Sequence, residues 1–266
     1  MPDSVLSDVT EGLATITLNR PDAMNALNRS TKEALRDALR EAAENRTVRA
    51  VLLTGNGRAF CVGQDLKEHI GTLAAQDDDA AGSALDTVRD HYNPITEAIA
   101  GMPKPVVAAV NGPAAGAGFG FALAADYRLA AESATFSTAF AGVALSTDSG
   151  LAWTLPRFIG QGRAADLLLT GRRIDAAEAG RLGIVQRVVP DAELREAAAR
   201  MARQLAQGPT LAYASIKEAM AYAATHSLSE TLEREAQLQV EAGASEDHRT
   251  AVAAFVDKER PVYKGR

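Results

Sequence analysis

The stretch KPVVAAVNGPAAGAGFGFALAAD, residues 104–126, decides the fold of this chain. It begins with an apolar run that ends at Asn111-Gly112, which is typical of a buried strand closed by a turn. A glycine- and alanine-rich segment follows, and then an apolar helix-like segment that ends on Asp126. Small residues let another part of the chain, or a ligand, approach the backbone closely. No side chain between Ala114 and Ala125 can transfer a proton, so the acid or base of a site here must come from elsewhere.

Segments on both sides of this stretch predict an α/β core. LATITLNR at 13–20 alternates apolar and polar residues as a half-buried strand does, and AVLLTGNG at 50–57 predicts a buried strand. Between them, Ser30 and Glu33 match a capping box that opens a helix. Helical patterns dominate after Arg163. The order predicts an α/β core over residues 1–200 and a helical C-terminal part over 201–266.

Composition excludes several classes of protein. The chain has 266 residues, 47% of them hydrophobic, and a net charge of −6, which disfavours a nucleic-acid partner. The single cysteine excludes an intrachain disulfide and a cysteine-rich zinc site, and it fits a reduced cytoplasm. The N-terminus lacks a signal-peptide pattern, and no apolar run has the length of a membrane span. We therefore expect a cytoplasmic protein with no membrane or nucleic-acid partner and no metal site.

Two glycine-containing loops follow the two buried strands. They are AFCVGQDLKE at 59–68 and NGPAAGAGFG at 111–120. The free N–H groups at a turn that enters a helix favour an anion. One N–H from each loop could meet a single oxygen and form an oxyanion hole. On spacing alone, GAGFG fits equally well as a close contact between a helix and a strand. The sequence has no GxxxxGK[ST] motif, which disfavours a nucleotide site.

Four segments together resemble the enoyl-CoA hydratase/isomerase (crotonase) superfamily. In order they are LNRPDAMNAL, AFCVGQDLKE, the opening stretch extended to Phe136, and LTGRRIDAAEAGRLGIVQRVV. The resemblance implies a crotonase (ClpP-like) fold of stacked ββα units with a helical C-terminal trimerisation part. It also implies a homotrimer or a dimer of trimers, and acyl-CoA thioester substrates. No separate cofactor is implied, because coenzyme A enters as part of the thioester.

The resemblance also assigns residues to the site. The oxyanion hole would use the backbone N–H groups of Gln64 and Ala117. The strip containing Ala23, Met24 and Ala26 would hold the pantetheine arm. The other substrate-binding positions are Val62, Asp65, Leu66, Gly116, Gly120 and Phe140. Asp65 also fits as a helix cap.

This sequence differs from the hydratases of the family in the residues that would act as acid and base. Their two glutamates correspond here to Gly120 and Phe140, which puts a two-carboxylate hydration in doubt. One carboxylate remains nearby, Asp148 in LSTDSGLAWTLPR at 145–157. Relatives that shift double bonds, or that rearrange ring-modified aromatic acyl-CoA thioesters, place an aspartate there. A single carboxylate can carry out a 1,3-proton shift, so we expect isomerisation of an unsaturated or ring-modified acyl-CoA.

Several alternatives remain open at this point. Asp148 also fits an exposed turn or the N-cap of the next helix. The chain fits a hydratase that replaces the missing glutamates, a hydrolytic dehalogenase with Asp148 as nucleophile, or a non-catalytic acyl-CoA binder. We interpret His91 as non-catalytic and Cys61 as a packed hydrophobe. The phenylalanines at 119, 121, 136 and 140 are candidates for an apolar acyl pocket. Residues 71–86 predict a surface loop or a weak helix.

Overall fold

A computed structural model of the chain describes residues 3–68, 70 and 85–266. Its main sheet has six strands in the order β1-β2-β3-β4-β6-β9. Their bounds are Val5–Thr10, Leu13–Leu18, Ala50–Gly55, Val106–Val110, Tyr127–Ala131 and Arg187–Val189. Only the β1–β2 pair is antiparallel; β3, β4, β6 and β9 continue the sheet in parallel, with Val51 opposite Val106 and Ala108 opposite Arg128. The predicted strands at 13–20, 50–57 and 104–112 are confirmed.

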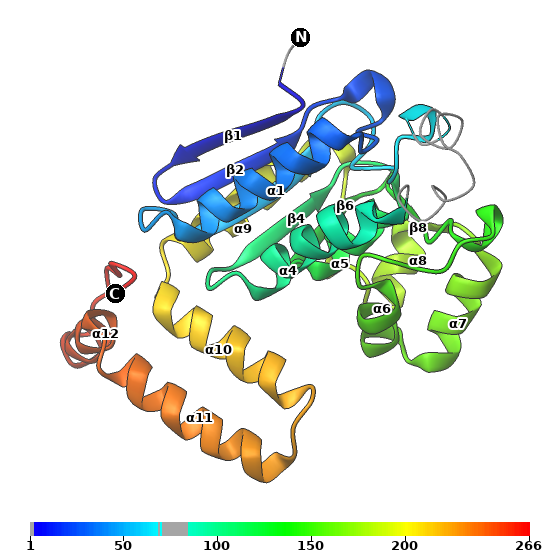
Figure 1. The fold of residues 1–266 in the computed structure, drawn as a ribbon. Helices are drawn as coiled ribbons and strands as arrows, with labels where there is room; N and C mark the ends of the chain where they lie inside the picture. The colour runs from blue at the N-terminus through cyan, green and yellow to red at the C-terminus, as the bar shows by residue number, and fades with distance from the viewer. Residues whose placement is uncertain (1–2, 69, 71–84) are drawn as a thin grey trace.

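Helices cover both faces of this sheet (Figure 1). On one face lie α1 (Arg29–Glu44), α4 (Asn93–Gly101) and α5 (Ala117–Ala124), packed on alternate strand residues such as Ile16 and Leu53. On the other face α9 (Asp191–Ala206) packs on the residues between them, such as Leu52 and Val107. Because both faces are buried, the inner strands are nearly continuous apolar runs, as parallel strands are.

A second, smaller sheet stands beside the first. Its order is β5-β7-β8, with bounds Ala114–Ala115, Thr135–Ser137 and Ile174–Asp175. The chain alternates between the two sheets: β4 and β6 belong to the main sheet, and the strand that follows each of them, β5 and β7, belongs to the small one. This is the stacked arrangement that we expected. On this side of the molecule lie α6 (Leu151–Ile159), α7 (Gln161–Thr170) and α8 (Ala176–Arg181), together with the short turn Ala141–Val143, whereas the turn Pro21–Ala23 lies near Gly57, after β3.

The C-terminal helices α10 (Thr210–Ala223), α11 (Leu228–Gly243) and α12 (Glu246–Asp257) extend away from the sheet (Figure 1). Among the contacts that attach this part of the chain to the core, Lys217 of α10 pairs with Asp126 at 2.7 Å, and Arg49 donates to the carbonyl of Tyr263, beyond α12, at 2.9 Å. Asp126, the last residue of the opening stretch, also accepts from the Val106 N–H. The predicted division at residue 200 falls inside α9, which packs on the sheet as far as Ala206.

The capping box predicted at Ser30 and Glu33 is wrong. Helix α1 is capped by Asn28, whose side chain accepts from the Thr31 N–H at 3.0 Å, and Ser30 is already within the helix. Asn28 also accepts from the hydroxyls of Ser30 and Thr31. Asparagine is as good a cap as serine, and the bridge between Leu27 and Gln64 places the chain so that residue 28 takes the position.

We expect Asn28→Ala to lower the free energy of unfolding by about 1 kcal/mol, because it leaves the Thr31 N–H without its acceptor. Ser30→Ala, at the position first predicted as the cap, serves as the control and should cost less than about 0.5 kcal/mol. Urea denaturation followed by circular dichroism measures both. Equal losses in the two variants would contradict this assignment.

Candidate functional site

The two glycine-containing loops meet through a parallel bridge between Cys61 and Ala114. The Cys61 N–H donates to the Pro113 carbonyl at 3.2 Å, and the Ala115 N–H donates to the Cys61 carbonyl at 2.9 Å. The loops are about 50 residues apart in the chain, but they follow neighbouring parallel strands, whose carboxyl ends lie at the same edge of a sheet. The sequence-based expectation that both loops lie together therefore holds in the structure.

Helix α5 packs against the first loop so closely that its second residue has to be glycine. A Cβ atom at Gly118 would lie 2.2 Å from the Cys61 carbonyl oxygen. The same contact brings the first N–H of α5 to the loop: the position of a Cβ on Gly63 is 3.5 Å from the Ala117 nitrogen. Thus GAGFG makes a close packing contact, and this contact places the Ala117 N–H beside Gly63.

Neither candidate oxyanion donor has an acceptor among the residues that the structure describes. Gln64 forms a parallel bridge with Leu27, in which the flanking Gly63 carbonyl and Asp65 N–H bond to Leu27. In such a bridge the N–H of the central residue, Gln64, points to the opposite side. No hydrogen bond joins the N–H of Gln64 or Ala117 to an acceptor among the residues that the structure describes. Ala117 also stands at the N-terminus of α5, where the helix dipole favours negative charge.

The strip at 20–27 lies along the first loop and is held rigidly. Asn25 is fully buried; its side chain accepts from the Arg20 N–H and donates to the Ala59 carbonyl at 2.8 Å. Met24 and Asn25 both have positive φ, of 52° and 56°. Consecutive left-handed residues other than glycine cost free energy and persist where the surroundings fix them. The sequence analysis did not single out Asn25, because nothing local to it shows its long-range partners.

Asp65 contacts both its own helix turn and the strip at 20–27. It accepts from the Lys67 N–H at 3.1 Å, as a helix cap does, and it pairs with Arg20 at 2.9 Å. The second contact ties the strip at 20–27 to the loop. The expected neighbours Ala23, Ala26, Val62 and Leu66 lie on these same two segments, and Leu66 has an exposed side chain.

Asp148 does not cap a helix, and that alternative is wrong. Helix α6 begins after Gly150, and no side chain caps it. The Asp148 carboxylate accepts from the Ser149 hydroxyl at 2.7 Å, and burial raises its pKa above the ordinary value. The Asp148 charge also contributes to the raised pKa of Tyr92, so the two side chains are close enough to interact. Two buried hydroxyl oxygens in this region, Thr96 and Thr147, have no partner among the described residues.

The absence of a side chain at Gly120 allows the segment around Asp148 to pack closely against α5. A Cβ atom at Gly120 would lie 2.5 Å from both the Cβ and the carbonyl oxygen of Ser149. Ser149 itself is buried and has a positive φ of 51°. The space that a side chain at position 120 would need is therefore filled by the residue next to Asp148. A glutamate at 120 and this position of Asp148 exclude one another.

The four phenylalanines divide into two groups. Phe119, Phe121 and Phe136 are at most 1% exposed and belong to the hydrophobic core. Phe140 is half-buried, and its ring lies 3.7 Å from where a Cβ on Gly116 would stand. Phe140 therefore places an apolar ring next to the glycine that precedes Ala117.

Cys61 and His91, both interpreted from the sequence as non-catalytic, have packed surroundings. Cys61 is completely buried, and burial raises the pKa of its thiol to about 12, so it stays protonated at neutral pH. The His91 ring contacts the Thr87 hydroxyl and lies 3.9 Å from Glu33, on the α1 side. Burial lowers the pKa of His91, which favours its neutral form.

A polar group that the sequence analysis missed lies behind Gln64. The side-chain carbonyl of Gln64 accepts from the Lys32 ammonium at 3.2 Å and from the Tyr92 hydroxyl. These three residues come from α1, from the loop, and from the π-helical turn η3 (Val88–Tyr92) that leads into α4. Lys32 has no signal in the sequence beyond a charge at the end of an amphipathic face. Only the fold turns it inward.

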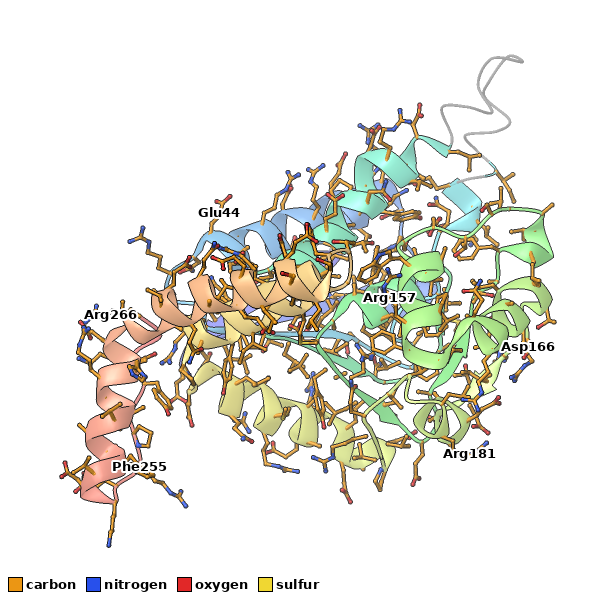
Figure 2. All side chains as sticks on the ribbon, turned by 90° about the horizontal axis from the view of Figure 1, so that it is seen from below. Glu44, Arg157, Asp166, Arg181, Phe255 and Arg266 are labelled. Atoms are coloured by element: carbon orange, nitrogen blue, oxygen red, sulfur yellow. The ribbon has the colours of Figure 1, made fainter. Side chains whose placement is uncertain are left out.

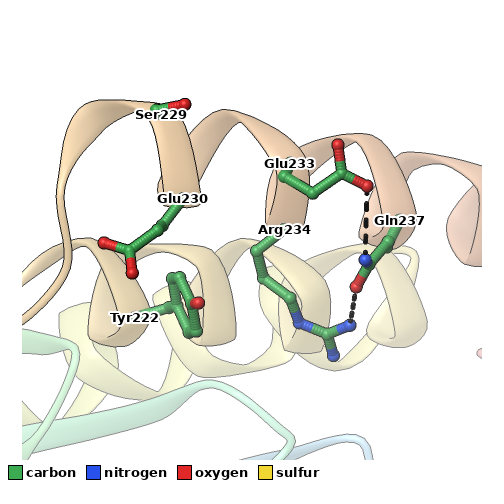
Figure 3. Close-up of a pocket in the computed structure, with 6 residues that line it drawn as sticks. All are labelled: Tyr222, Ser229, Glu230, Glu233, Arg234 and Gln237. Atoms are coloured by element: carbon green, nitrogen blue, oxygen red, sulfur yellow. Dashed lines mark hydrogen bonds between the residues drawn. The ribbon is translucent and has the colours of Figure 1, made fainter.

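Two cavities lie among the C-terminal helices, not at this site. Figure 3 shows the polar one, with Tyr222, Glu230 and Arg234 between α10 and α11. The other is an apolar groove of about 700 Å³ between the same helices. In the part of the chain that the structure describes, no group of acidic, histidine or cysteine side chains could hold a metal ion. Within those residues no helix is long and apolar enough to cross a membrane.

We expect Gly120→Ala to lower the free energy of unfolding by about 1–3 kcal/mol, because the added methyl group overpacks against Ser149. The matched control is Gly142→Ala, at a position where an added Cβ meets nothing within 4 Å; its effect should stay within about 0.5 kcal/mol. Urea denaturation measures both. If Gly120→Ala were as stable as the control, the close contact with Ser149 would be wrong.

Comparisons with known proteins agree with this geometry. Residues 8–266 match the family model described as enoyl-CoA hydratase/isomerase. A protein of Rhodobacter capsulatus named "Probable enoyl-CoA hydratase" is 45% identical over 260 residues, 97% of either chain. The 1,2-epoxyphenylacetyl-CoA isomerase of Escherichia coli is 40% identical, and all of both chains is covered.

Solved structures share the fold as well. A structure from Mycobacterium abscessus that carries an enoyl-CoA hydratase/isomerase description superposes with a TM-score of 0.94 at 46% identity, over 98% of this chain and 100% of that one. The expected crotonase fold is thereby confirmed. The paired loops, the fold and the match over nearly the whole chain together show that this protein is an acyl-CoA enzyme of the enoyl-CoA hydratase/isomerase family.

Proposed function

We propose that this enzyme isomerises an unsaturated or ring-modified acyl-CoA, with Asp148 as its single proton-transferring group. The observation that supports this most is the packing of Ser149 into the space at Gly120. This packing leaves no room for a side chain at position 120, and it puts the half-buried carboxylate of Asp148 one residue away from the contact. The relative that rearranges 1,2-epoxyphenylacetyl-CoA makes an aromatic acyl group one candidate.

In the proposed reaction the thioester oxygen accepts from the N–H groups of Gln64 and Ala117. For a 3-enoyl-CoA, the Asp148 carboxylate takes the proton from the carbon next to the thioester, and the electron pair moves into a dienolate. The protonated Asp148 then returns the proton to the γ-carbon, which gives the conjugated 2-enoyl-CoA. No oxidant, metal or separate cofactor is needed, because atoms and electrons balance within the substrate and one carboxyl group.

Each part of the site has a physical task in this reaction. The dienolate concentrates negative charge on the thioester oxygen, and each fixed N–H donor there contributes roughly 3–4 kcal/mol to lowering the barrier. Burial raises the pKa of Asp148, which brings the carboxylate closer to the basicity needed for removing a carbon-bound proton. The half-buried Phe140 ring beside Gly116 offers apolar surface to the acyl group.

Two other functions fit parts of these observations. The R. capsulatus relative carries a hydratase name, so addition of water by groups other than two glutamates is the first alternative. A non-catalytic acyl-CoA binder would also keep the fold and the paired N–H groups. The three functions differ in what Asp148 does, and this makes Asp148→Asn the decisive substitution.

We expect Asp148→Asn to abolish isomerisation of a 3-enoyl-CoA, with kcat reduced by about 10²–10⁴, the range for loss of a general base. Ultraviolet absorbance follows the conjugated product, and mass spectrometry in D₂O follows proton exchange and gain of water. The wild type should also lose kcat/KM as the pH falls through a value above the ordinary 3.8 of aspartate, since the active form is the carboxylate and burial raises its pKa.

The control is Asp8→Asn on the exposed face of β1, which should leave turnover unchanged. Gain of water by a 2-enoyl-CoA that Asp148→Asn does not affect would contradict the isomerase and favour the hydratase. Binding of both thioesters with turnover of neither, in wild type and variant alike, would favour the binder.

We also propose that the C-terminal helices, residues 201–266 of the predicted division, assemble the protein into a homotrimer or a dimer of trimers. The apolar groove between α10 and α11 is bordered by side chains that stand in water, among them Met220, which is 70% exposed. Phe255 on α12 is 84% exposed and lies at the opposite end of the molecule from Asp166 (Figure 2). Apolar surface of this extent is typical of an interface between protein chains.

We expect the wild type to elute as a trimer or hexamer in size-exclusion chromatography with light scattering, and Met220→Glu to shift it to monomer, because a buried unpaired carboxylate is costly. Leu6→Glu on β1, another exposed apolar position, is the control and should keep the wild-type mass. A monomeric wild type, or an unchanged mass for Met220→Glu, would overturn the proposal.

A further inference from the structure

The side chain of Gln64 is held by two donors from distant parts of the chain. Lys32 Nζ donates to its carbonyl oxygen at 3.2 Å, and the Tyr92 hydroxyl donates to the same oxygen. Gln64 is also the residue whose backbone N–H faces away from Leu27 and has no acceptor within residues 3–68, 70 and 85–266. One residue thus combines a fixed side chain with a free backbone donor.

The chemistry of the three groups allows only one orientation of the amide. An ammonium group donates and cannot accept, so the oxygen of Gln64, and not its NH₂, must face Lys32. The amide is neutral, and it therefore satisfies both donors without adding negative charge beside the place where an enolate would form. A glutamate at position 64 would also satisfy them, but its charge would oppose the enolate.

Lys32 is unusually buried for a lysine. It is 3% exposed, its ammonium also donates to the Thr87 hydroxyl at 2.8 Å, and it lies 5.5 Å from the centre of the Tyr92 ring. Glu68 is 3.8 Å away, which is an ion-pair distance but longer than a hydrogen bond. Burying an ammonium is costly. Here it places a positive charge directly behind the loop that carries Gln64.

Tyr92 connects this cluster to Asp148. Its side chain is 2% exposed and packs edge-on against Phe121 of α5, with 6.1 Å between ring centres. It ends a π-helical turn, a feature that is frequent at functional sites. Burial and the nearby Asp148 charge raise the pKa of Tyr92, so its hydroxyl remains protonated and available as a donor.

We propose that Lys32 and Tyr92 are positioning residues of the oxyanion hole, which hold Gln64 by its side-chain carbonyl so that its backbone N–H stays directed at the thioester oxygen. This inference rests on the proposed function, in which Gln64 and Ala117 form the hole. The backbone bridge to Leu27 fixes one side of the loop, and the Lys32–Gln64–Tyr92 cluster fixes the other. An oxyanion donor acts only within a narrow range of distance and direction, so fixing both sides matters for the rate.

The test measures how strongly the hole polarises a bound thioester. Butyryl-CoA labelled with ¹³C at the carbonyl is saturated and does not isomerise, and infrared difference spectra give its carbonyl stretch when bound. In wild type the frequency of this carbonyl stretch should lie below its value in water. Tyr92→Phe and Lys32→Met should each shift the frequency part of the way back toward its value in water. In turnover of 3-enoyl-CoA they should lower kcat about tenfold, less than the ~100-fold expected for removing a donor outright, with little change in KM.

The double variant Lys32→Met/Tyr92→Phe should lose less than the product of the two single losses, because both act through one oxygen atom. Tyr127→Phe, on the half-buried Tyr127 of β6, is the matched control and should change neither the stretch nor kcat. Thermal melting shows whether a variant has lost stability, and so distinguishes unfolding from displacement of Gln64 in a folded protein.

The inference is overturned if wild type polarises the carbonyl and both single variants keep the wild-type stretch and kcat, whatever their melting temperatures. If wild type itself leaves the stretch at its value in water, the oxyanion hole fails and the proposed function fails with it. The two failures are thereby distinguished by the wild-type spectrum alone.

Discussion

The close backbone contact between Cys61 and residues 113–118 is the constraint on which the rest of the site depends. Two hydrogen bonds join Cys61 to Pro113 and Ala115, and Gly118 approaches the Cys61 carbonyl more closely than any residue with a Cβ atom could. Because strands β3 and β4 are adjacent and parallel, their following loops leave the sheet together. The N-terminus of α5 is then held against the first loop, with the Ala117 nitrogen 3.5 Å from where a Cβ on Gly63 would stand.

In the proposed site the backbone supplies the oxyanion donors, so side chains are needed only to hold these donors in place and to move a proton. Asp148 can stand where it does because residue 120 has no side chain and Ser149 fills the space. On the other side of the loop, Lys32 and Tyr92 meet at the Gln64 carbonyl. One group of polar side chains thus surrounds the Asp148 carboxylate, and another lies behind the loop that carries Gln64. The same segments in a relative with a glutamate at 120 would have to pack differently.

The elements that the sequence predicted well are those whose signal is local and long. The apolar runs at 50–57 and 104–112 and the alternation at 13–20 all became strands of the main sheet. The strands β5, β7, β8 and β9 have two or three residues each, too few for a periodic pattern. The cap of α1 was assigned to Ser30 and belongs to Asn28, since several polar residues in a row fit the motif and the Leu27–Gln64 bridge selects one. The predicted segment at 71–86 lies almost wholly outside the described residues.

By itself the sequence determined the family, the α/β class and the two loops with their glycines, because these depend on which residues follow one another. It also showed that glutamate is absent at 120 and 140, and the resemblance predicted Asp148 as the catalytic carboxylate. Only the tertiary structure decided that Asp148 caps no helix, that Ser149 occupies the space at Gly120, and that Lys32 and Tyr92 converge on Gln64. The contacts at Gly120 and at Gln64 join residues about 30 positions apart in the chain. Their geometry is determined by the packing of whole elements, which no local pattern records.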